Sequence, residues 1–168
     1  MYSIFDNEVE INNDYSAITV GYQGNHIGII TEIYTNDQQR EIRYADFFPV
    51  PGETIESGIF HAIVSSSTQG MVRCKILLKD TQHEVMQALR LTSTSITYRV
   101  EKTLVSSMLR AILDELHGNV AVPQFHIRGM NHDNNAINAH SWVHSKLAIA
   151  NIDIQIIEPW YSKSCSIS

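Results

Sequence analysis

The chain lacks the features that identify several large classes of protein. Only two of its 168 residues are cysteines, Cys74 and Cys165, and Cys74 lies inside the apolar stretch "MVRCKILL". A disulfide framework is therefore not indicated. The sequence has no run of about 18 apolar residues, and its first residues contain no basic segment followed by an apolar one. We expect neither a transmembrane segment nor a Sec signal, which suits a cytoplasmic protein or one delivered by a specialised secretion system.

An excess of basic residues is also missing. The chain has 12 lysines and arginines against 18 aspartates and glutamates, which gives a formal net charge of −6. A protein with this balance is not attracted at long range to phosphate backbones or to anionic membranes. We therefore expect no nucleic acid among its partners.

The sequence does contain enough apolar residues for one core. Hydrophobic residues make up 43% of the chain, and no internal repeat, low-complexity tract or convincing linker divides it. The sequence predicts a single domain over residues 1–168, in which residues 160–168 form a flexible tail.

Alternation of apolar and polar residues predicts the first strands. The segments 15–22 and 26–34 are rich in β-branched residues and are typical of strands joined by a turn at 23–25. A second turn at 35–39 leads to a third strand at 40–48. These three strands should form a meander.

Further strands are predicted later in the chain. The segments 58–64 and 71–78 have strand-like composition and are separated by a polar turn at 65–70. A last strand at 152–157 would return to the sheet.

Three helices complete the predicted fold. The first begins near Asp80, and the second runs from about Val100 to His117, with Gly118 at the left-handed cap position. The third begins near Ala139, after an Asn-rich loop suited to capping. The sequence therefore predicts an α+β domain with a mostly antiparallel sheet and about three helices packed on one face.

Two windows of the sequence carry a resemblance. In "GNHIGIITEIY", His26 opens a strand and is followed by Ile-Gly-Ile, and in "INAHSWVHSKL" Asn138 and Ala139 open a helix near the end of the chain. Together they resemble the circularly permuted branch of the NlpC-type papain-like superfamily, which includes lecithin:retinol acyltransferase-like proteins. The resemblance implies a permuted papain-like fold in which His26 is the catalytic base and a Cys stands at the start of the late helix.

This chain departs from that pattern, because Ala139 stands where the nucleophilic Cys belongs. Without a thiol no covalent acyl intermediate can form. An introduced Cys-to-Ala change, a natural pseudoenzyme and accidental similarity all explain the alanine, and we favour the first. A thiol at this position would lie near the N–H groups of the first helical turn, which stabilise a thiolate and can hold an oxyanion.

The residue that orients His26 should come from the neighbouring strand. Tyr44 and Asp46 lie on one face of "IRYADF". The resemblance favours Tyr44, whereas chemistry favours Asp46, since a carboxylate stabilises an imidazolium. Gly28 shares the face of His26 and would leave space beside the ring. Each residue also has a structural interpretation, such as Tyr44 in the core or Asp46 as a turn cap.

The other histidines do not form a convincing metal site. His140 and His144 are four residues apart and could share a metal with His126 or His132. No cysteine or acidic residue completes a recognised spacing, so we expect no metal and no cofactor.

The sequence thus predicts a cysteine peptidase or amidase that hydrolyses amide or ester bonds, present here in an inactive Ala139 form. The resemblance implies a peptide or protein substrate and, for a secreted bacterial effector or toxin, an inhibitor or immunity protein as partner. The alternatives are a thiol acyltransferase acting on lipid or protein, and a non-catalytic binding module with a natural Ala139. The sequence at Cys165 has the shape of a prenylation box, although chance explains it better, so membrane attachment is expected only if Cys165 is lipidated.

Overall fold

The computed structural model of the chain describes a sheet with two helices. The described residues are 1–23, 26–50, 68–77, 95–126 and 136–153. The predicted strand at 58–64 and the predicted helix that begins near Asp80 lie outside them, as does most of the predicted last strand.

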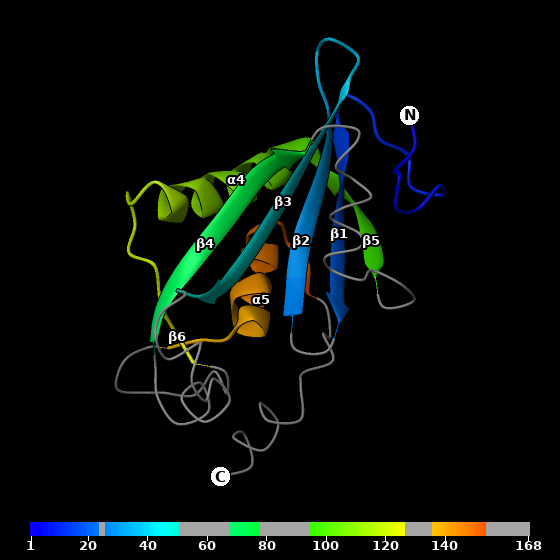
Figure 1. Ribbon diagram of the computed structural model, residues 1–168. Coiled ribbons are helices and arrows are strands. Elements are labelled where there is room, and N and C mark those ends of the chain that lie inside the picture. Colours follow the sequence, from blue (N-terminus) through cyan, green and yellow to red (C-terminus); the bar gives the residue numbers. More distant parts are fainter. Residues whose placement is uncertain (24–25, 51–67, 78–94, 127–135, 154–168) are drawn as a thin grey trace.

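Six strands form one antiparallel sheet in the order β5-β1-β2-β3-β4-β6 (Figure 1). The strands are β1 (Tyr15–Gln23), β2 (His26–Tyr34), β3 (Arg40–Pro49), β4 (Thr68–Leu77), β5 (Ile96–Glu101) and β6 (Gln124–Phe125). The predicted meander of three strands is confirmed as β1, β2 and β3. The turn between β2 and β3 is closed by the Thr35 N–H, which donates to the Gln39 carbonyl at 2.8 Å, and Gln38 takes the left-handed φ of 58°.

The register of these strands decides which side chains share a face. Gly28 lies opposite Asp46, and Ile30 lies opposite Tyr44. Because side chains alternate along a strand, His26, Gly28, Tyr44 and Asp46 belong to one face of the sheet. The intervening residues Ile27 and Ile29 of β2 and Ala45 and Phe47 of β3 belong to the opposite face.

Two helices, α4 (Lys102–Leu116) and α5 (Ala139–Ile149), cover the face to which Ile27 and Ile29 belong (Figure 1). Gly118 follows α4 with a φ of 78°, which confirms the predicted left-handed cap. No helix in the described part of the chain is long and apolar enough to span a membrane.

The structure corrects several predicted boundaries. Val100 belongs to strand β5, so the second predicted helix begins two residues later, at Lys102. Thr68 begins β4, so residues 68–70 extend a strand that was expected to start at 71. Strands β5 and β6 were not predicted. Both depend on long-range pairing, with β1 and β4 respectively, which local periodicity does not reveal.

The core between sheet and helices is built around Phe47. Its ring is stacked on the Trp142 ring at a centroid distance of 5.9 Å and tilted against Phe125 at 5.7 Å. The Trp142 indole N–H donates to Glu115 of α4 at 3.3 Å, and Lys146 pairs with the same carboxylate. This polar contact ties α5 to α4 at the edge of an apolar core.

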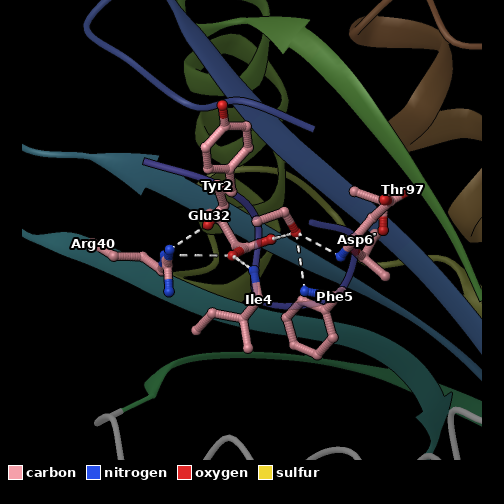
Figure 2. A network of polar contacts seen from close by, with 9 residues as sticks. Tyr2, Ile4, Phe5, Asp6, Glu32, Arg40 and Thr97 are labelled. Carbon is pink, nitrogen blue, oxygen red and sulfur yellow. Dashed lines mark hydrogen bonds and ion pairs between the residues drawn. The ribbon is translucent and has the colours of Figure 1, made fainter. Parts of the chain in front are cut away.

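The N-terminal segment lies on the sheet face opposite the helices and is anchored by the buried Glu32 (Figure 2). The Ser3 hydroxyl donates to one carboxylate oxygen of Glu32, and the Ile4 N–H donates to the other at 2.8 Å. Arg40 lies 3.5 Å from the same carboxylate. Phe5 packs against a small cluster formed by Ile30, Ile42 and Tyr44. The N-terminal segment therefore covers part of the face that carries Tyr44.

Replacing Gly70 by alanine should destabilise the fold, because a Cβ there would lie 2.2 Å from the Pro123 carbonyl oxygen and 2.5 Å from the Phe47 ring. We expect the free energy of unfolding of Gly70→Ala to fall by about 3 kcal/mol in urea denaturation. The control is Gly118→Ala, which meets nothing within 4 Å and is opposed only by its positive φ, at about 1 kcal/mol. A smaller loss for Gly70→Ala than for Gly118→Ala would contradict this packing.

Replacing Glu32 by glutamine should change how stability depends on pH. Burial raises the pKa of Glu32 above its ordinary value of 4.5, against the opposing effects of Ser3, Ile4 and Arg40. The folded state therefore binds this proton more tightly than the unfolded chain, and its contribution to stability is lost as pH rises through the folded pKa. Relative to Glu32→Gln, the unmodified chain should lose stability as pH rises from the ordinary value of 4.5 through the raised folded pKa. A pH-independent difference in urea denaturation would contradict this account, and Glu41→Gln, which removes a half-buried partner of Arg43, is the control.

Candidate functional site

Strands β2 and β3 bring three predicted site residues into contact. The His26 Nε2 lies 3.1 Å from the Tyr44 hydroxyl and 3.1 Å from Asp46 Oδ2. The Tyr44 hydroxyl also donates a hydrogen bond to Asp46 Oδ2. Tyr44 and Asp46 were alternatives for the residue that orients His26. The structure places both of them on the same ring nitrogen.

The three side chains differ sharply in their access to solvent. Asp46 is fully buried and Tyr44 is 9% exposed, whereas the side chain of His26 is 38% exposed. The imidazole therefore stands at the surface with a buried acceptor behind it. The interpretation of Asp46 as a turn cap is wrong, because Asp46 lies within β3.

Arg73 of β4, which was not predicted as a site residue, completes this network. Its Nε donates to Asp46 Oδ1 at 2.9 Å and its Nη2 to Asp46 Oδ2 at 2.5 Å. Arg73 lies directly opposite Asp46 in the register of β3 and β4. The available signal was an arginine inside the apolar stretch "MVRCKILL", where a charge is expected to have a partner. Finding the partner required the strand pairing.

The hydrogen bonds settle the protonation of this network. Burial alone would raise the pKa of Asp46, but hydrogen bonds from His26, Arg73 and Tyr44 together hold it below its ordinary value. Burial and the adjacent Asp46 charge raise the pKa of Tyr44. Asp46 is thus ionised and Tyr44 is protonated at neutral pH. Because an ionised carboxylate only accepts hydrogen bonds, the imidazole proton belongs on Nε2, which leaves Nδ1 as the basic nitrogen.

Ala139 begins helix α5, as predicted. The side chain of Asn138 caps this helix by accepting a hydrogen bond from the Ser141 N–H at 2.9 Å. Ala139 itself is 5% exposed and belongs to the core cluster that contains Phe47 and Trp142. Its methyl group therefore lies on the helix-covered side of the sheet.

Strand β2, which His26 opens, and helix α5 begin at the same end of the sheet. Helix α5 contacts β2 and β3, and both α5 and β2 begin at the lower end of the view in Figure 1. The buried His140 follows Ala139, and burial is the main cause that lowers its pKa to about 4. Since His26 and Ala139 belong to opposite sides of the sheet, they can approach each other only around the beginning of β2.

Metal binding finds no support in the described part of the chain. No group of three His, Cys, Asp or Glu side chains among residues 1–23, 26–50, 68–77, 95–126 and 136–153 is arranged to hold an ion. His126 and His140 are buried, His144 is half-buried, and His132 lies outside the described residues. The side chains in contact at this site are an imidazole, a phenol, a carboxylate and a guanidinium.

Comparisons with known proteins give no relative for this chain. No family model, no curated protein and no solved structure matches it. The interpretation of the site therefore depends on its own geometry.

Replacing Asp46 by asparagine should destabilise the protein in a pH-dependent manner. Asparagine is uncharged, and its NH2 group cannot accept hydrogen bonds from Arg73, Tyr44 or His26. We therefore expect the free energy of unfolding to fall by about 2 kcal/mol at neutral pH. Because the folded pKa of Asp46 is lowered, its stabilisation is present above the ordinary value of 3.8 and is lost as pH falls through the folded pKa.

The measurement is urea denaturation of both proteins at about pH 7 and about pH 3, where the difference should shrink. The exposed Asp14, replaced by asparagine, serves as the matched control. An equally large effect of Asp46→Asn at both values of pH would show that Asp46 does not contribute through its charge.

Proposed function

We propose that this chain carries the base of a thiol-hydrolase site of the permuted NlpC type, with Ala139 at the position of the nucleophile. One observation carries the proposal: the half-exposed His26 ring has its Nε2 fixed by the buried Asp46 and Tyr44. This arrangement is the one a general base requires, because the second nitrogen is then free of its proton and directed away from the carboxylate. The substrate class is an acyl compound, a peptide amide or an ester.

With a cysteine at position 139, the residues present can perform a complete reaction. His26 Nδ1 takes the thiol proton, and the thiolate attacks the carbonyl carbon to form a C–S bond. N–H groups in the first turn of α5 would stabilise the oxyanion. The imidazolium then gives its proton to the leaving amine or alcohol. Water, deprotonated by the same ring, hydrolyses the thioester and restores the thiol.

With alanine at position 139, the base and its supports remain but the covalent step is lost. The chain would then bind an acyl substrate without cleaving it. A non-catalytic binding module with a natural alanine is the second candidate, and it is favoured by the packing of the Ala139 methyl group in the core cluster. The codon at this position in the source genome separates the two, since a cysteine codon supports the enzyme.

Introducing a thiol by Ala139→Cys tests the proposed base directly. A cysteine near the N-terminus of α5 and beside His26 should have a lowered pKa and react with iodoacetamide at about pH 6.5, roughly ten times faster than an ordinary thiol. The rate is measured for each cysteine-containing peptide by mass spectrometry over a range of pH. Adding His26→Ala should shift the pH profile back towards that of an unassisted thiol.

The matched control is Ala148→Cys, which places a thiol on an exposed position of the same helix. The natural Cys74 is an internal reference, because burial raises its pKa. Comparing the midpoints of the pH profiles, and not only the rates, removes the effect that restricted access to position 139 has on the rate. Equal midpoints for Ala139→Cys and Ala148→Cys, unchanged by His26→Ala, would overturn the proposed function.

A further inference from the structure

We infer that Arg73 is a positioning residue for the His26 base. Its guanidinium locks the Asp46 carboxylate in place and offsets the carboxylate charge, so that the carboxylate holds the His26 ring by its Nε2. This inference rests on the proposed function, because it assigns Arg73 a role in that same site.

The geometry shows how Arg73 immobilises the carboxylate. Two guanidinium nitrogens contact the two oxygens of Asp46, at 2.9 Å and 2.5 Å, which is the paired arrangement that arginine makes and lysine cannot. The guanidinium also lies over the Phe48 ring, 4.2 Å from its centroid. Arg73 is thus held on one side by a ring and on the other by the carboxylate. A carboxylate held in this way cannot rotate away from His26.

Crowding on one oxygen explains why a fixed carboxylate matters. Asp46 Oδ2 receives the Arg73 Nη2, the Tyr44 hydroxyl and the His26 ring nitrogen. These donors come from three neighbouring strands, and each limits the direction that the others can take. Without the fork from Arg73, the carboxylate could turn to satisfy Tyr44 alone and release the ring.

The charges around His26 explain the second effect of Arg73. Asp46 and Tyr44 face the ring from β3, Arg73 faces Asp46 from β4, and His140 lies in the first turn of α5, which contacts β2. The N-terminal segment contributes the apolar Phe5 beside Tyr44, and the next basic residue along β4, Lys75, is exposed.

Arg73 is therefore the main cation that opposes the Asp46 charge. Removing it would leave a buried carboxylate whose nearest counter-charge is a protonated His26. The ring would then bind its proton more tightly. At neutral pH a smaller fraction of it would be free to accept a proton from the nucleophile.

The test is to follow the ring nitrogens of His26 by two-bond ¹H–¹⁵N correlation spectra as pH is varied, in the full chain with Ala139 unchanged. In the unmodified chain the neutral ring should carry its proton on Nε2. In Arg73→Met the midpoint of His26 protonation should rise by about one pH unit or more, since an opposite charge at this range shifts titration by one to three units. Arg73→Lys keeps the charge but not the fork, so it should restore most of the midpoint while leaving a mixture of ring tautomers.

The matched control is Arg99→Met. Arg99 lies on β5, and like Arg73 its guanidinium lies over an aromatic ring, here that of Tyr15. This substitution should leave the His26 midpoint and tautomer unchanged. If Arg73→Met does not fold, Arg73→Gln provides the neutral variant, with the same upward shift expected. A folded neutral variant with an unchanged midpoint and an unchanged Nε2 tautomer would overturn the inference, even if its melting temperature had dropped.

This experiment fails separately from the test of the proposed function, because it needs no thiol. If the His26 midpoint moves as expected while the Ala139→Cys thiol is not activated, Arg73 tunes the histidine but the nucleophile position is wrong. If the Ala139→Cys thiol is activated while the midpoint of His26 protonation in Arg73→Met does not move, the proposed function is supported and the role given to Arg73 is wrong.

Discussion

The site depends on one buried carboxylate. Asp46 is removed from water at the centre of the sheet, where an isolated charge would be strongly unfavourable. It is tolerated because Arg73, Tyr44 and His26, from three adjacent strands, each donate a hydrogen bond to it. The same bonds that stabilise the charge also fix the tautomer of His26 and keep Tyr44 protonated. The interactions that stabilise the buried charge therefore also orient the His26 ring.

The two faces of the sheet are covered by different parts of the chain. One face packs on α4 and α5 through an apolar core in which the Phe47 ring is central. The other carries the Asp46 network, and the N-terminal segment, anchored on Glu32, packs Phe5 beside Tyr44. The position of Ala139 belongs to the first face and the imidazole of His26 to the second. A shared site can therefore exist only where β2 begins and both faces end.

Much of the fold could be predicted from the sequence, because β1, β2, β3 and α5 carry strong local patterns and turn residues. The same alternation correctly placed His26 with Gly28 on one face of β2, and Tyr44 with Asp46 on one face of β3. Arg73 and strands β5 and β6 could not be predicted, since each depends on a partner far away in the chain. The choice between Tyr44 and Asp46 had no answer in the sequence either. It depends on how a single nitrogen is shared between two acceptors, which only the register of β2 and β3 decides.

The central claim is that the imidazole at position 26 reaches around the end of β2 to the β-carbon of position 139. The most direct measurement is the nuclear Overhauser effect between the Ala139 methyl protons and the carbon-bound ring protons of His26 in the unmodified chain. The account predicts a cross-peak between them, beside those that join the methyl group to the aromatic core. Cross-peaks from the methyl group to the Phe47 and Trp142 rings alone, with the His26 ring contacting only Tyr44, would contradict it.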